Sequence, residues 1–106
     1  MAVQIANDTT FQEFLNANEN VIVKYYADWC GSCKLFAPKF RRLSESETGT
    51  GVVFLDVNAE ESPEARKIAG VDNLPFFAIF KNGQLVEATS TSKEEKVVEL
   101  IEKVKA

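Results

Sequence analysis

Apolar residues in this chain occur in two kinds of pattern, short continuous runs and longer stretches with helical spacing. Residues 21–27 (VIVKYYA) and 52–57 (VVFLDV) are almost wholly apolar, β-branched or aromatic, which is typical of strands buried on both faces of a sheet. The segments around these runs repeat apolar residues every three or four positions, as amphipathic helices do. The pattern therefore predicts an α/β protein.

Local signals predict where the elements begin and end. Thr10 and Glu13 match a capping box, Ser62-Pro63 matches a helix start, and Asn82-Gly83 favours a type I′ hairpin turn. The expected elements are strands at 3–5, 21–27, 52–57, 76–80 and 84–89, and helices starting at Thr10 and within 30–33, over 62–70 and over 92–105. This order, β-α-β-α-β-α-β-β-α, predicts a mixed, mainly parallel sheet ending in an antiparallel hairpin, with helices on both faces, as a single domain over residues 1–106.

Composition and charge exclude several classes of function. The 106 residues carry a net charge of −4, and the only basic cluster is Lys39, Arg41 and Arg42, so we expect no nucleic-acid partner. The longest apolar stretch, 74–80, is far shorter than the roughly 20 residues of a membrane span, so we expect no membrane partner. The first ten residues lack the features of a secretory signal. We therefore expect a cytoplasmic protein, in a compartment where disulfides are more often catalytic than structural. That the protein is a monomer is a separate expectation.

The chain has two cysteines, both in the segment WCGSCK (29–34), and no histidine. Histidine-based catalysis and histidine metal ligation are therefore excluded. A closed zinc site needs four Cys or His ligands, so we expect no metal within one chain, although a metal shared by two chains remains an alternative. A purely stabilising disulfide is another, but closing so short a loop contributes only about 2 kcal/mol. The remaining hypothesis is reversible thiol–disulfide chemistry.

The position of the two thiols supports this hypothesis. Cys30 follows a buried strand and lies where a helix begins, and the free N–H groups and dipole of a helix N-terminus favour a thiolate. Cys33 lies one turn later and deeper, where it is placed to attack a mixed disulfide formed at Cys30. Gly31 leaves room for an incoming polypeptide.

Four features together resemble the thioredoxin family, and the resemblance covers nearly the whole chain. They are the segment ADWCGSCK (27–34), Pro38 in the following helix, the Leu74-Pro75 step before a strand, and FKNG at 80–83. The resemblance implies a thiol–disulfide oxidoreductase with Cys30 as nucleophile and Cys33 as resolving thiol. It also implies that the redox-active Cys30–Cys33 disulfide serves in place of any cofactor.

The resemblance also implies how substrates bind. Pro75 would be a cis-proline packed over the disulfide, and Leu74 would offer its backbone to an extended substrate strand. Trp29, Gly31, Ser32 and Pro75 would form a shallow apolar surface beside it. The expected partners are disulfide-containing client proteins and an external reductase, because the chain has no Gly-x-Gly-x-x-Gly motif for a dinucleotide.

Three positions depart from the family pattern. Ser32 stands where typical members have proline, which affects the redox potential, and Thr91 stands in place of a glycine in a loop facing the substrate. Lys24 replaces a buried aspartate that manages the proton of the resolving cysteine. The lysine that accompanies that aspartate on the next strand aligns with Phe54 in this chain.

Lys24 leaves two interpretations open. Burial favours the neutral form of a lysine, which could accept the Cys33 proton, whereas a charged Lys24 would favour the Cys33 thiolate electrostatically. Alternatively, the stem packs in the core and the ammonium group reaches water, towards Asp28 or Asp56.

Three functions follow as hypotheses. The first is a reductase of client disulfides. The second is a disulfide oxidase or isomerase, favoured if Ser32 and Lys24 raise the potential. The third is a non-catalytic thioredoxin-fold module that binds partners or senses redox state.

Overall fold

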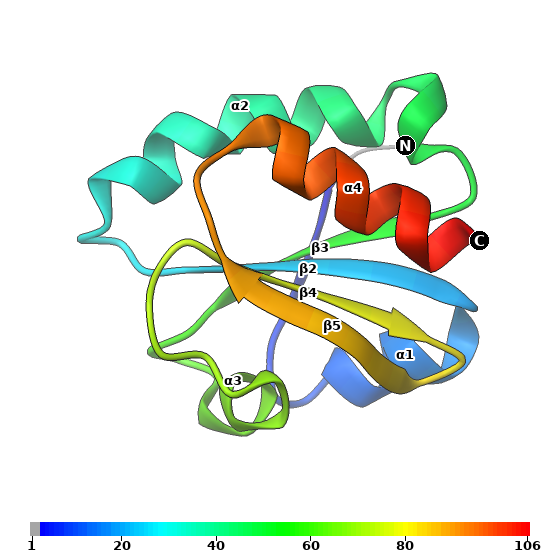
Figure 1. The fold of residues 1–106 in the computed structure, drawn as a ribbon. Helices are drawn as coiled ribbons and strands as arrows, with labels where there is room; N and C mark the ends of the chain where they lie inside the picture. The colour runs from blue at the N-terminus through cyan, green and yellow to red at the C-terminus, as the bar shows by residue number, and fades with distance from the viewer. Residues whose placement is uncertain (1–2) are drawn as a thin grey trace.

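The computed structural model describes residues 3–106 and contains one five-stranded sheet between two layers of helices (Figure 1). The strand order is β1-β3-β2-β4-β5. β1 pairs in parallel with β3, and β3 with β2, whereas β4 runs antiparallel to β2 and β5 antiparallel to β4. The bounds are β1 Gln4–Ala6, β2 Asn20–Tyr26, β3 Val53–Asn58, β4 Phe76–Lys81 and β5 Gln84–Ser90. The predicted α/β fold and its final antiparallel hairpin are confirmed.

Helices cover both faces of the sheet, as predicted. α2 and α4 lie on one face, and α1 and α3 lie on the other (Figure 1). The element order matches the prediction apart from one additional short 3₁₀-helix, η1, after α2. The bounds are α1 Phe11–Ala17, α2 Gly31–Ser44, η1 Glu47–Gly49, α3 Pro63–Ala69 and α4 Glu94–Lys105.

The turn signals act as predicted, but the capping signals do not. Asn82 and Gly83 both have positive φ, 52° and 81°, as a type I′ hairpin turn requires. α1 does begin after Thr10, but the predicted capping box is wrong, because Thr10 Oγ1 accepts the Asn7 N–H instead of a helical N–H. α3 is capped from a distance: Asp8 accepts the N–H groups of the second and third helical residues, while Ser62 makes no side-chain cap.

Aromatic packing fixes α2 on the sheet. Phe77 of β4 is fully buried, and its ring centroid lies 5.1 Å from that of Phe36 and 5.7 Å from that of Phe40, both on α2. Buried aromatic pairs at these separations add to the free energy of burial. These pairs hold α2 against the sheet, and the two cysteines lie at the N-terminus of this helix.

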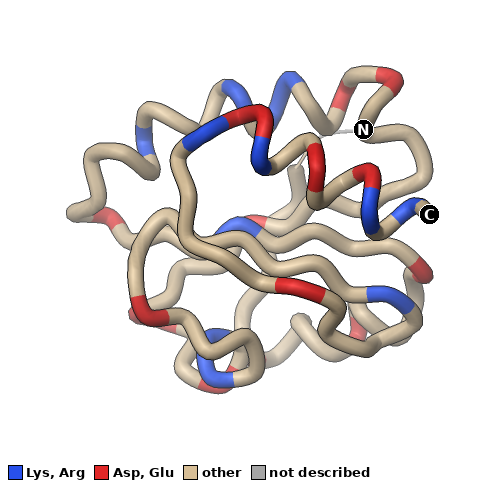
Figure 2. Tube along the Cα trace, in the orientation of Figure 1, with Lys and Arg blue, Asp and Glu red and all other residues tan. Residues whose placement is uncertain are grey.

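Charged residues are distributed over the helices and the turns. Figure 2 shows Lys and Arg interspersed with Asp and Glu along the visible part of the trace, including α4. Among the helices of residues 3–106, none combines the length and the apolar content that crossing a bilayer requires.

Candidate functional site

The two cysteines form a disulfide at the N-terminus of α2. Cys30 is the N-cap residue of this helix, its Cα lies 5.3 Å from that of Cys33, and its Sγ accepts the Cys33 N–H at 3.2 Å. Cys30 is 5% exposed and Cys33 is 2% exposed. The Ser32 hydroxyl oxygen lies 3.6 Å from Cys30 Sγ. Because a disulfide sulfur carries no hydrogen, the hydroxyl group is the donor. Two hydrogen-bond donors thus point at the sulfur that the sequence predicts to be the nucleophile.

Trp29 forms the exposed rim of the site. Its side chain is 68% exposed, so it is not a core aromatic, and its indole Nε1 donates to Glu60 Oε2 at 2.6 Å. Gly31 also faces open space, since a Cβ built there would meet no atom within 4 Å. Glu60 was not identified from the sequence, because it lies 31 residues from Trp29 and belongs to no motif.

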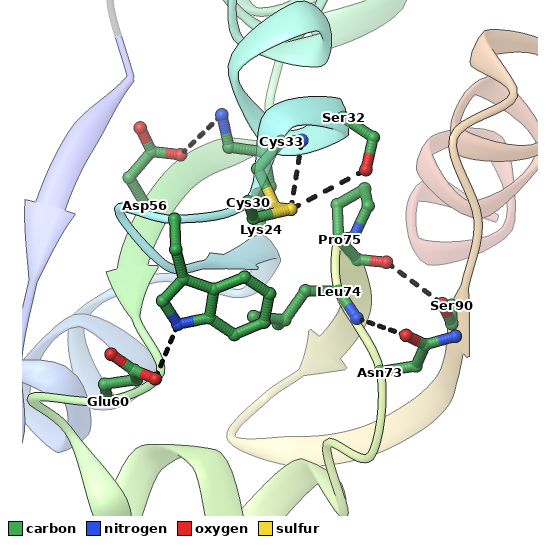
Figure 3. Close-up of a disulfide and its surroundings, with 11 residues drawn as sticks. Lys24, Cys30, Ser32, Cys33, Asp56, Glu60, Asn73, Leu74, Pro75 and Ser90 are labelled. Atoms are coloured by element: carbon green, nitrogen blue, oxygen red, sulfur yellow. Dashed lines mark hydrogen bonds and ion pairs between the residues drawn. A yellow bond between two sulfur atoms is a disulfide. The ribbon is translucent and has the colours of Figure 1, made fainter.

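The Leu74–Pro75 peptide bond is cis, as the resemblance implies, and lies close to the disulfide (Figure 3). Pro75 is buried, and its carbonyl accepts both the Ser90 hydroxyl at 3.2 Å and the Thr91 N–H at 3.3 Å. The Leu74 N–H donates to the side-chain oxygen of Asn73 at 3.0 Å. The backbone of Leu74 is expected to bind a substrate strand. Its N–H group is therefore already occupied by a neighbouring side chain.

Lys24 lies on the other side of the disulfide from Leu74 and Pro75, together with Asp56 (Figure 3). Its Nζ is 3.4 Å from Asp56 Oδ1, and the two side chains are 3% and 26% exposed. Nζ also lies 5.3 Å from the ring centroid of Phe40. The ammonium group therefore points towards Asp56, one of the two expected acids, but it stays buried and does not reach water.

The alignment of Phe54 with the family's lysine is wrong. In the parallel pairing of β2 with β3, Lys24 lies opposite Asp56, whereas Phe54 lies opposite Ile22 and packs against Phe40 with ring centroids 5.0 Å apart. A shift of two residues along a strand keeps the same face, so the apolar pattern could not detect the error. The chain thus keeps an acid–base pair across these strands, with the lysine on the central strand and the acid on its neighbour.

Burial controls the ionisation of the groups near this pair. Desolvation raises the pKa of Asp56, and the charge of Lys24 opposes that rise. Desolvation also raises the pKa of Tyr26, and the charges of Asp56, Asp28 and Glu61 add to the effect. At neutral pH Tyr26 is therefore a neutral phenol.

The site holds no apparent metal centre. Within residues 3–106, no group of three or more Cys, Asp or Glu side chains is arranged to hold a metal ion. The reactive group on this face is the disulfide.

Comparison with known proteins decides the family. A family model described as Thioredoxin matches residues 2–105. Human thioredoxin is 37% identical over 99 residues, which make up 92% of this chain and 92% of the human protein. The chain belongs to the thioredoxin family. Thioredoxin f from spinach chloroplast has the same fold, with a TM-score of 0.91 at 29% identity over 99% of this chain and 95% of that one.

Membership of the thioredoxin family identifies the activity in general terms. The chain is a thiol–disulfide oxidoreductase of the protein-disulfide reductase type, and its redox group is its own disulfide rather than a cofactor. A thioredoxin f2 solved in complex with ferredoxin:thioredoxin reductase is also similar, with a TM-score of 0.90 at 28% identity over 99% of this chain and 96% of that one. Neither the comparisons nor the described residues favour the oxidase, isomerase or non-catalytic alternatives.

Proposed function

We propose that this thioredoxin-family protein reduces disulfides in client proteins, with Cys30 as nucleophile and Cys33 as resolving thiol. The observation that supports these roles most directly is the asymmetry of the pair. Cys30 Sγ receives the Cys33 N–H and lies beside the Ser32 hydroxyl, whereas Cys33 is the more deeply buried cysteine. Donors at a helix N-terminus favour the thiolate, which is the attacking species.

The reaction has two steps. The Cys30 thiolate attacks one sulfur of the client disulfide, which releases the other client sulfur as a thiolate that takes up a proton. The Cys33 thiolate then attacks Cys30 Sγ, forms the Cys30–Cys33 disulfide and releases the second client thiol. The client gains two electrons and two protons, and the protein loses them.

The proposed client surface consists of Trp29, Gly31, Ser32, Leu74 and Pro75. Trp29 and Gly31 are exposed, and the Trp29 indole is held by Glu60, so an apolar platform is already formed beside the disulfide. Leu74 would bind an extended client segment through its backbone, a mode that tolerates many sequences. Lys24 would favour the Cys33 thiolate through its charge.

Asn73 competes with the client for Leu74, so Asn73→Ala is expected to strengthen client binding. Freeing the Leu74 N–H removes a hydrogen bond worth about 0.5–1.5 kcal/mol, so KM for a protein disulfide should fall about two- to tenfold with little change in kcat. Steady-state kinetics would measure this effect. Asp72→Ala, at the exposed neighbouring position, is the control and should leave KM unchanged; equal KM values for all three proteins would show that Asn73 does not compete.

We also propose that an external reductase returns the disulfide to the dithiol. The chain then carries electrons from that reductase to its clients. The complex of thioredoxin f2 with a reductase supports this arrangement for a similar protein. We place the chain in the cytoplasm, because a reducing compartment suits a dithiol that must be regenerated. We propose a monomer, because one chain carries both thiols and the whole client surface.

A coupled assay tests the proposed function. The protein, a thioredoxin reductase with its electron donor, and a disulfide-bonded client are mixed, and donor oxidation is followed. We expect continuous turnover that requires all three components. A binding module would instead bind the client without turnover and bind it equally well as a Cys30→Ser variant, which would contradict the proposal.

A further inference from the structure

Helix α2 carries only basic charge, although the chain as a whole has a net charge of −4. Its charged residues are Lys34, Lys39, Arg41 and Arg42 (Figure 2). None of them forms an ion pair with an acid of residues 3–106. Arg41 and Arg42 lie in the last turn, where the helix dipole favours cations. The dipole gives no such reason for Lys34 and Lys39.

A hollow of about 220 Å³ lies between α2 and the segment that follows β5. Its wall is formed by Ser32, Leu35, Phe36, Lys39 and Ser92. Small-molecule and cofactor sites usually measure about 300–1,000 Å³, so this hollow suits one side chain better than a cofactor. The Ser32 hydroxyl oxygen also lies 3.6 Å from Cys30 Sγ. The hollow therefore opens one side chain away from the sulfur that is proposed to attack the client.

The polar groups of this hollow suit a carboxylate. The Lys39 Nζ atom lies 6.0 Å from the ring centroid of Phe36, and this cation–π contact keeps the ammonium group beside the hollow. The hydroxyl groups of Ser32 and Ser92 add two possible hydrogen-bond donors. Leu35 and Phe36 supply apolar surface for the stem of an incoming side chain. Together these groups match the side chain of an aspartate or a glutamate.

The segment on the other side of the hollow does not cancel this positive charge. Glu94 and Glu95 lie in the first turn of α4, where the helix dipole favours acids, and neither lines the hollow. Lys93 is exposed and follows Ser92 directly. The charge nearest to the hollow is therefore that of Lys39.

The opposite side of the disulfide carries the opposite charge. Figure 3 shows Glu60 and Ser32 on different sides of the disulfide, and Glu60 accepts the Trp29 indole N–H. Asp28 and Glu61, the sequence neighbours of Trp29 and Glu60, are exposed acids as well. Complementary charges attract and like charges repel across an interface. An acidic client residue is therefore attracted to the side of α2 and repelled from the side of Trp29.

We propose that the hollow is a subsite for an acidic side chain of the client, one or two residues from the client cysteine that bonds to Cys30. This subsite rests on the proposed function, and its preferred clients are disulfides flanked on one side by Asp or Glu. The spacing follows from the closeness of Ser32 to Cys30 Sγ, because an extended residue spans about 3.3–3.6 Å. Lys39 thus sets specificity and takes no part in the transfer of electrons.

The test uses the reduced full-length protein and short synthetic peptides with one cysteine, each activated as a mixed disulfide with 2-thiopyridine. The Cys30 thiolate attacks the peptide sulfur, the bond from that sulfur to thiopyridine breaks, and 2-thiopyridone leaves and is followed by its absorbance. The peptides are otherwise neutral and carry Glu, Gln or Lys one or two residues before or after the cysteine. Second-order rate constants are measured at about 0.01 M and 1 M salt, where the Debye length is about 30 Å and 3 Å.

We expect a Glu peptide to react about two- to fivefold faster than the matching Gln peptide on one side of the cysteine, and a Lys peptide to react more slowly. High salt should remove the difference. Lys39→Gln should lose the preference, and Lys39→Glu should prefer the Lys peptide. Lys67→Gln is the matched control and should keep the wild-type preference, because Lys67 is an exposed lysine on α3, across the sheet from α2.

Each contrary outcome is distinct. Equal rates for the Glu and Gln peptides at every position would overturn the subsite, and so would a Lys39→Glu variant that still prefers Glu. An equal gain from Glu on both sides of the cysteine would show a general effect of charge and would also overturn it. If the wild type releases no 2-thiopyridone from any peptide, the proposed role of Cys30 fails instead.

Discussion

Replacing Cys33 with serine is expected to trap client proteins on Cys30. Cys30 keeps its place as N-cap of α2, where helix N–H groups still favour its thiolate, so the first attack proceeds. The mixed disulfide then has no neighbouring thiol to attack it, and turnover in the coupled assay should fall to background. Non-reducing electrophoresis with mass spectrometry should show a stable adduct of one client per chain at Cys30.

Cys30→Ser is the matched control for this experiment. It removes the nucleophile and leaves Cys33, which is 2% exposed and has little access to a client disulfide. We expect neither turnover nor an adduct. An adduct with Cys30→Ser and none with Cys33→Ser would reverse the assigned roles of the two cysteines.

The largest expected loss of stability comes from Phe77→Ala. Phe77 is fully buried and packs against Phe36 and Phe40, which hold α2 on the sheet. Removing a buried Phe side chain costs about 3–5 kcal/mol, from a total free energy of unfolding of roughly 5–15 kcal/mol for a small domain. Urea denaturation of the oxidised protein should show a much lower midpoint with a similar slope.

Leu35→Ala provides the control for that measurement. Leu35 is also apolar and lies on α2, but its side chain is 76% exposed. Its removal should change the free energy of unfolding by less than about 0.5 kcal/mol. If the two variants lost equal stability, Phe77 would not be the residue that holds α2 in place.

The fold could be predicted from the sequence because most elements carry a strong local signal. The buried run at β2, the Asn82-Gly83 turn and Gly70 at the end of α3 each depend on the conformational preferences of nearby residues. Helix caps were less predictable. Asp8 caps α3 from 56 residues away, and no local pattern could indicate that contact.

Some residues of the candidate site could likewise be predicted from the sequence, and others could not. The WCGSCK segment and Leu74-Pro75 are contiguous motifs, so the sequence indicated them. Glu60 and Asn73 belong to no motif and become visible only through their hydrogen bonds to Trp29 and Leu74. The Lys24–Asp56 pair required the register of β2 against β3, which the two-residue periodicity of strands leaves undetermined.

We expect the Cys30–Cys33 pair to act as a reductant of client disulfides. Equilibration of the pair with glutathione buffers, followed by thiol alkylation and mass spectrometry, measures its potential directly. We predict a midpoint more negative than about −230 mV, on the reducing side of most glutaredoxins. A midpoint near −180 mV or above, roughly the range of disulfide isomerases and oxidases, would show that the pair is not a reductant of client disulfides.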